Sequence, residues 1–186
     1  MKITTKQIAQ TGLLLALCIA SQFLKNTSVY ITGPIVNVTI IIAVLAVGLG
    51  SGILISVIAP VTSYLITASP LISAIPWIMP MIMIGNCILA VCVWLFEKKF
   101  RFPGRLPAGL VAGSVLKAAF MTLAIVKLLF TVYASSLSDK QLAMGRITFS
   151  TTQLITSLIG SVLAFLIWIP LKKDLNNSDP FEKISQ

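Results

Sequence analysis

Two lysines, Lys117 and Lys127, interrupt a long apolar stretch of the sequence and are the residues that most need a chemical partner. An ammonium group in hydrocarbon is costly, so such a lysine normally faces protein, water or a bound molecule. The acidic residues all lie outside the apolar stretches: Glu97, Asp139, Asp174, Asp179 and Glu182. We therefore expect backbone carbonyls, water or an anionic ligand to face the lysines. Lys127 has an alternative, because it lies nearer a predicted span end and can extend its ammonium to the membrane surface.

Asn86, Lys127 and Gln153 lie on three different predicted helices at a similar depth. At a rise of about 1.5 Å per residue, each is about 8–10 Å from the predicted outer end of its helix. A mostly apolar pocket with a few convergent polar groups is typical of small-molecule sites. The other candidate substrate-binding residues lie near this layer or are placed to wall it: Asn37, Trp77, Lys117, Tyr133, Thr148 and Thr152. The alternative is that the Asn and Gln side chains only join helices through hydrogen bonds.

Patterns for catalysis and metal binding are missing from the sequence. It contains no histidine, and its three cysteines lie inside apolar stretches, so neither a metal ligand set nor a disulfide framework is expected. No glycine-rich phosphate loop ending in Lys-Ser/Thr is present, and no nucleophile–base–orienter set. We therefore expect no enzyme activity, no metal and no cofactor. The lack of a membrane-embedded Asp, Glu or His also disfavours a proton-coupled carrier.

The composition is that of an integral membrane protein. Of 186 residues, 57% are hydrophobic and 10% are charged, and the mean hydropathy is +0.99, whereas soluble domains carry about 25% charged residues. A helical span needs roughly 20 apolar residues. Six runs can serve as spans: 7–24, 35–47, 53–68, 77–96, 108–133 and 147–170. We expect an all-α bundle of six transmembrane helices over residues 1–171 and a polar cytoplasmic tail at 172–186.

The net charge of +9 comes mainly from Lys and Arg at the ends of the apolar runs, which indicates a membrane orientation signal rather than nucleic-acid binding. With the N-terminus inside, the cytoplasmic segments carry nine basic residues: Lys2, Lys6, Lys98, Lys99, Arg101, Arg105, Lys172, Lys173 and Lys183. The outer segments carry three: Lys25, Lys140 and Arg146. This excess predicts that both ends of the chain are cytoplasmic.

Glycines and prolines indicate where the helices are interrupted. The Gly-Pro pair at 33–34 is a turn signal, and the polar stretch 134–145 is expected to be a loop. The glycine-rich stretch 48–52 is expected to be a tight turn between the second and third helices. Pro60 predicts a kink within the third helix, because proline removes one backbone hydrogen bond.

Gly12, Ala16 and Ala20 lie on one face of the first predicted helix. Small residues at this spacing let another helix approach closely, either within the bundle or on a partner. The segment Ala16-Leu-Cys-Ile-Ala20 is similar to the Ala-x-x-x-Ala docking motif of the substrate-binding S components of bacterial energy-coupling factor (ECF) vitamin transporters. The region from 30–37 through 47–52 resembles the first outer loop, second helix and glycine-rich turn of the same family. The resemblance covers nearly the whole chain.

The resemblance implies a subunit of the bacterial plasma membrane that captures a vitamin or related micronutrient near the outer face. It implies docking, through the face of Gly12, Ala16 and Ala20, on a membrane coupling subunit that is joined to two cytoplasmic ATPases. Two other functions stay open: a structural or assembly subunit without a ligand, and a stand-alone small-molecule carrier.

Overall fold

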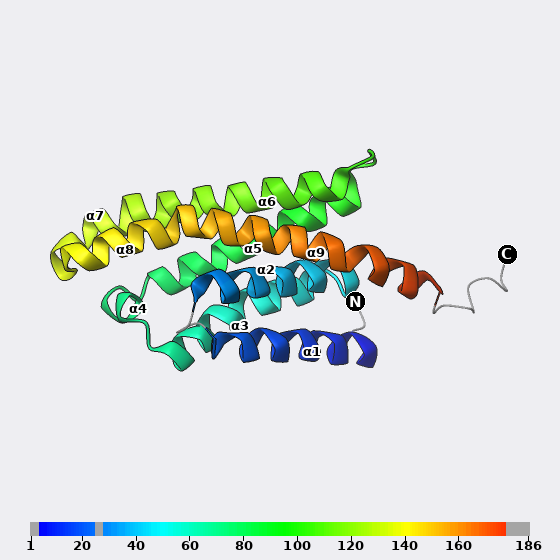
Figure 1. Ribbon diagram of the computed structural model, residues 1–186, viewed down its shortest axis with the longest axis horizontal. Coiled ribbons are helices and arrows are strands. Elements are labelled where there is room, and N and C mark those ends of the chain that lie inside the picture. The colour runs from blue at the N-terminus through cyan, green and yellow to red at the C-terminus, as the bar shows by residue number, and fades with distance from the viewer. Residues whose placement is uncertain (1–3, 25–27, 178–186) are drawn as a thin grey trace.

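A computed structural model describes residues 4–24 and 28–177 of the chain. The described residues form helices and their connections, with no strand among them, which confirms the all-α expectation. Figure 1 shows the long helices lying side by side along one direction. In chain order the elements are α1 (Thr5–Gln22), α2 (Val29–Ala46), α3 (Leu49–Thr67), α4 (Pro70–Ala74), α5 (Ile78–Lys99), α6 (Arg105–Met121), the π-helix η1 (Thr122–Leu129), α7 (Phe130–Val132), the 3₁₀-helix η2 (Ala134–Ser136), α8 (Asp139–Phe149) and α9 (Thr151–Asn177).

Five stretches of the described residues are long and apolar enough to cross a membrane: Val29–Ala46, Leu49–Thr67, Ile78–Lys99, Arg105–Val132 and Asp139–Lys173. They confirm a helical, multi-pass membrane protein. α1 has the same length as α2, 18 residues, but its hydropathy is lower than that of a span. Lys6, Gln7 and Gln10 account for part of this difference. The sixth expected span therefore stays a prediction.

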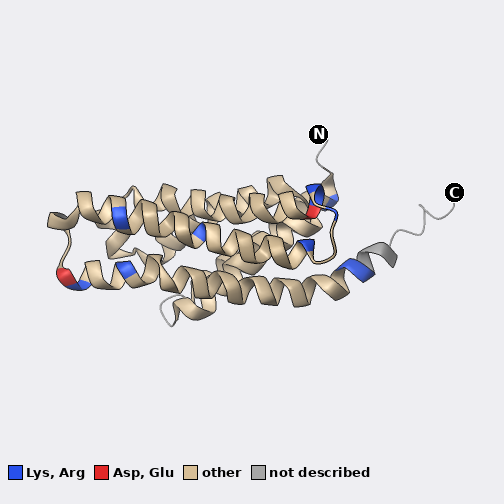
Figure 2. Cartoon of the chain, turned by 90° about the horizontal axis from the view of Figure 1, so that it is seen from above, with Lys and Arg blue, Asp and Glu red and all other residues tan. Residues whose placement is uncertain are grey.

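Most of the basic residues gather at the end of the bundle where α1 begins and α9 ends (Figure 2). At this end Glu97 of α5 accepts hydrogen bonds from Nε and Nη2 of Arg105 of α6, each at 3.2 Å. Lys172 of α9 lies 3.7 Å from the same carboxylate. One acidic residue therefore joins three helices at the charged end.

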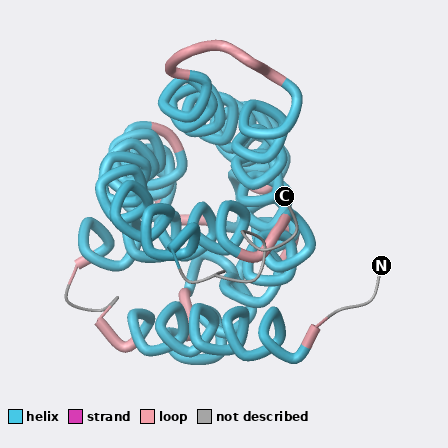
Figure 3. Tube along the Cα trace, turned by 90° about the vertical axis from the view of Figure 1, so that its right-hand side faces the viewer, coloured by secondary structure: helices cyan, strands magenta, loops and turns pink. Residues whose placement is uncertain are grey.

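α2 is the central helix of the bundle. It packs against α1, α3, α5 and α9. Half of its residues are buried, a larger share than in the other four candidate spans. A helix that is apolar on all sides belongs in the interior, and residues 39–44 of α2 are all buried. Figure 3, a view along the long axis, shows that the described residues are helices joined by loops.

The second and third helices begin earlier than the sequence predicted. α2 starts directly after Ser28, whose hydroxyl accepts a hydrogen bond from the Tyr30 backbone N–H at 3.2 Å. The prediction of a turn at 33–34 was wrong, because both residues lie inside α2. The helix tolerates this proline, which removes only one backbone hydrogen bond. The turn between α2 and α3 is also shorter than the expected 48–52. Gly48, with φ +133°, is its glycine, and the rest of that stretch is helical.

The prediction of a loop at 134–145 was also largely wrong, because most of these residues are helical. α8 begins at Asp139, where Ser138 and Gln141 form a capping box in which each side chain accepts the other's backbone N–H. A break at Ser150, with φ −117° and ψ −89°, separates α8 from α9. The cap at Ser138 thus starts helical structure upstream of the last predicted run, 147–170, and the break at Ser150 falls inside that run.

α5 and α6 approach each other closely at Gly109. A Cβ atom added to Gly109 would lie 2.6 Å from the Cβ atom of Phe96, whereas one added to Gly12 of α1 would meet nothing within 4 Å. We predict that Gly109→Ala lowers the free energy of unfolding by about 1–3 kcal/mol, because overpacking displaces the backbone. Gly12→Ala should leave it unchanged or raise it slightly. Thermal unfolding of the detergent-purified variants measures both, and equal midpoints would contradict this account of the packing.

Candidate functional site

A partly enclosed cavity of about 250 Å³ lies between the helices, toward the end of the bundle where α1 finishes and α2 begins. Seven helices contribute a polar residue to its lining: Gln22 of α1, Asn37 of α2, Ser63 of α3, Asn86 of α5, Lys117 of α6, Thr148 of α8 and Gln153 of α9. Its apolar lining includes Val36, Ile72, Ile82 and Phe149. Apolar walls with a few convergent polar groups are the usual form of a small-molecule site.

Lys117 and Asn37 form a short hydrogen bond at this cavity. The Lys117 Nζ donates to the Asn37 Oδ1 at 2.6 Å, and the two residues are 3% and 2% exposed. Within the part of the chain that the structure describes, this is the only hydrogen bond of the ammonium, and no carboxylate lines the cavity. A neutral amide satisfies one donor but does not compensate the charge.

Close packing of α2 against α9 holds Asn37 in place. A Cβ atom added to Gly160 of α9 would lie 2.7 Å from the Asn37 Cβ and 2.9 Å from the Pro34 carbonyl oxygen. A Cβ atom added to Gly33 of α2 would lie 2.9 Å from a threonine methyl group of α9. Contacts this short do not occur between real side chains, so the two glycines allow the close approach of the helices. That approach positions Asn37 opposite Lys117.

Two further carboxamides face the cavity from α5 and α9. The Asn86 Nδ2 donates to the Ser56 carbonyl at 3.4 Å, which leaves the Asn86 Oδ1 as an acceptor. The Gln153 side chain makes no hydrogen bond with any described residue. The Thr148 hydroxyl donates to the Met144 carbonyl at 2.8 Å and keeps its capacity to accept. The cavity therefore offers an ammonium group together with neutral donors and acceptors.

The predicted substrate-binding residues divide into two groups. Five of them line this cavity: Asn37, Asn86, Lys117, Thr148 and Gln153. The other four do not: Trp77, Lys127, Tyr133 and Thr152. Trp77 is 60% exposed and Lys127 is exposed as well, whereas Thr152 is buried with its Oγ1 3.4 Å from the Tyr30 hydroxyl. A role in binding for this second group stays a prediction that the cavity does not support.

Helix geometry explains why the two lysines face different surroundings. Lys117 lies in α6, but Lys127 lies in the π-helix η1. Hydrogen bonds in a π-helix run from residue i to i+5. The side chains of η1 therefore do not point in the directions that the α-helical period of α6 predicts. The sequence pattern did not single out Gln22 and Ser63, because both lie inside predicted apolar runs and are uncharged.

The small residues of α1 lie on the outside of the bundle. Gly12, Ala16 and Ala20 are all exposed, whereas Thr11 and Cys18 are buried against the neighbouring helices. The Thr11 hydroxyl lies 2.8 Å from the hydroxyl of a serine at the start of α3. α1 thus attaches to the bundle partly through polar contacts and leaves its small-residue face uncovered. No group of three or more His, Cys, Asp or Glu side chains suited to a metal occurs among the described residues.

The Asn37–Lys117 contact predicts a specific pattern in a double-mutant cycle. Asn37→Leu should lower the free energy of unfolding by about 1.5–3 kcal/mol, because the ammonium loses its acceptor. Asn37→Leu combined with Lys117→Met should recover most of that loss, since replacing both partners by apolar groups of similar shape is nearly neutral. Denaturant unfolding of the two single variants and the double variant measures the coupling. Strictly additive effects would show that the two side chains do not interact.

The whole helical region from α1 to most of α9 is similar to one known family. Residues 6–172 match the family described as the ECF transporter, substrate-specific component. No curated protein sequence and no solved structure matches the chain. The match agrees with the five apolar spans and with a partly enclosed cavity among the helices. Because it covers far more than half of the sequence, this chain belongs to the family of substrate-specific components of ECF transporters, which are transport subunits.

Proposed function

We propose that this chain captures a small organic micronutrient, such as a vitamin, in the cavity beside Lys117 and Asn37. The observation that carries the proposal is the cavity itself, to which seven helices each contribute a polar side chain. Membership of the family supports it, because the subunit that gives an ECF transporter its substrate specificity needs a binding site. A subunit with a purely structural role has no need of such a space, since protein interiors otherwise pack closely.

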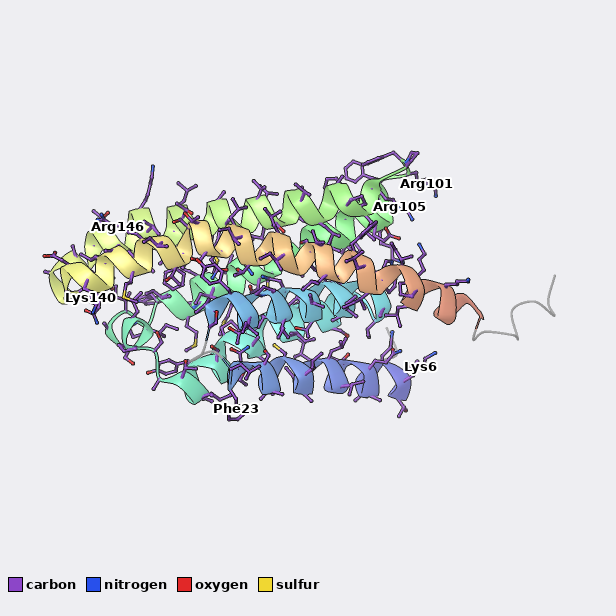
Figure 4. All side chains as sticks on the ribbon, in the orientation of Figure 1. Lys6, Phe23, Arg101, Arg105, Lys140 and Arg146 are labelled. Carbon is purple, nitrogen blue, oxygen red and sulfur yellow. The ribbon has the colours of Figure 1, made fainter. Side chains whose placement is uncertain are left out.

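The charge distribution supports an orientation with both ends of the chain in the cytoplasm. Figure 4 shows Lys6, Arg101 and Arg105 at one end of the bundle and Lys140 and Arg146 at the other. The end with more basic residues belongs inside by the positive-inside rule. The cavity lies toward the opposite end, since residues from the end of α1 and the start of α2 line it. In this orientation it takes up its ligand near the outer face.

Partner chains would supply the energy for transport, because the sequence has no phosphate-binding glycine-rich loop. We propose that a membrane coupling subunit, joined to two cytoplasmic ATPases in the bacterial plasma membrane, docks on α1. The exposed face of Gly12, Ala16 and Ala20 supports this, because small side chains permit close contact with a second helix.

Capture of a micronutrient predicts that protein purified from its native membrane retains one small organic molecule, which mass spectrometry identifies after denaturation. Gln153→Leu should reduce the retained amount several-fold, because it removes a hydrogen-bonding group from the cavity. Gln10→Leu is the matched control, since Gln10 of α1 lies outside the cavity lining. A preparation that retains no small molecule, or equal retention by the two variants, would contradict the proposal.

Docking on α1 predicts that Ala16→Leu reduces the recovery of ATPase subunits with the tagged protein from membranes solubilised in mild detergent. The larger side chain would separate α1 from its partner helix. Ala119→Leu is the matched control, because Ala119 is exposed on α6, a different helix. ATPase recovery that is equal for Ala16→Leu and Ala119→Leu would exclude α1 as the docking surface.

A further inference from the structure

The charge of the cavity restricts what it can hold. We infer that the captured molecule is a compact organic acid with a single negative charge, whose carboxylate binds the Lys117 ammonium beside Asn37. This inference rests on the proposed function, because it concerns the ligand of the same cavity. It follows from one juxtaposition: a buried ammonium hydrogen-bonded to a neutral amide, in a cavity that no described carboxylate lines.

No described acidic side chain is placed to compensate Lys117. Glu97 lies at the opposite, basic end of the bundle, where it already pairs with Arg105 and Lys172. Asp139 is at the exposed start of α8 and does not line the cavity. An uncompensated buried charge is costly, and the cost falls when an opposite charge binds. A ligand carboxylate therefore gains more in this cavity than a neutral group does.

The ammonium also retains hydrogen-bonding capacity. A lysine Nζ carries three donors, and among the described residues only Asn37 Oδ1 accepts from Lys117. A carboxylate has two oxygens with several acceptor positions, and charge-assisted hydrogen bonds are stronger than neutral ones. One carboxylate can therefore take the remaining donors while Asn37 keeps the ammonium oriented.

The other lining residues indicate which chemical groups the ligand carries besides its carboxylate. The Gln153 amide and the Asn86 Oδ1 are free to bond neutral hydroxyl, amide or ring nitrogen groups. Side chains such as Ile72 and Phe149 contact an apolar part. The volume of about 250 Å³ is below the range of roughly 300–1,000 Å³ for drug-sized ligands. With one lysine and this volume, the cavity does not suit nucleotides or other polyanions.

A carboxylate built into the protein would compete with that of the ligand. Asn37→Asp places an acidic group at the position from which Oδ1 now accepts from Lys117 at 2.6 Å. The variant should fold at least as stably as the wild type without ligand, because the charge is then compensated internally. It should lose affinity for organic acids, because the ammonium no longer lacks a counter-charge. Loss of binding with retained stability is a result that simple misfolding does not produce.

Matched pairs of acids and neutral analogues test the inference on the full-length protein in detergent: nicotinate with nicotinamide, pantothenate with panthenol, and biotin with biotin amide. Ligand-induced increases in the unfolding temperature report binding. At least one acid should stabilise the protein, and its neutral partner should bind about tenfold or more weakly. Lys117→Met and Asn37→Asp should abolish the response, whereas Lys117→Arg should retain part of it. Lys127→Met should leave it unchanged, because Lys127 is outside the cavity lining.

Several results would overturn the inference. They are equal binding of an acid and its neutral partner, an unchanged response in Lys117→Met, or loss of the response in Lys127→Met alone. For a ligand outside the panel, the charge of the molecule retained by the native protein decides. A retained neutral or cationic molecule would contradict the organic-acid inference and leave substrate capture intact. Retention of no molecule at all would contradict the proposed function itself.

Discussion

The Lys117 ammonium is buried in a bundle that has apolar walls and a neutral amide as its only described protein partner. Even after relaxation, removing such a charge from water costs several kcal/mol. The surrounding helices reduce this cost without removing the charge. α2 presents Asn37 at hydrogen-bonding distance, and the packing of α9 against α2 keeps it there. The cavity around the ammonium leaves room for a further partner.

Charge is compensated differently at the basic end and in the middle of the bundle. At the basic end, the Glu97 carboxylate pairs with both Arg105 and Lys172 and so connects the described helices α5, α6 and α9. In the middle of the bundle, Lys117 has no such pair with any described residue. Ion pairs that are already satisfied stabilise the arrangement of helices, whereas an unsatisfied charge creates affinity for something outside the chain. A helical bundle with ion pairs at one end and a cavity whose ammonium lacks a described counter-charge suits a binding subunit.

The parts of this structure that depend on hydropathy could be predicted from the sequence. The long apolar runs identified a helical membrane bundle, and Asn86 and Gln153, which were predicted to share one layer, both line the cavity. Helix starts were less predictable, because caps such as Ser28 and Ser138 extend helices into polar sequence. The different surroundings of the two lysines could not be predicted, since the π-helix η1 changes the side-chain directions and has no signature in the pattern of apolar residues.

α1 carries two parts of the proposed function on one helix. Its last residue, Gln22, lines the cavity, and its outer face carries Gly12, Ala16 and Ala20. If a molecule bound in the cavity favours one position of α1, the free energy of binding at that outer face changes by the same amount as the free energy of binding in the cavity. The reverse also holds: a partner that prefers one position of α1 changes the affinity of the cavity for its ligand. Under the proposed function, ligand loading and docking are therefore thermodynamically coupled through a single helix of 18 residues.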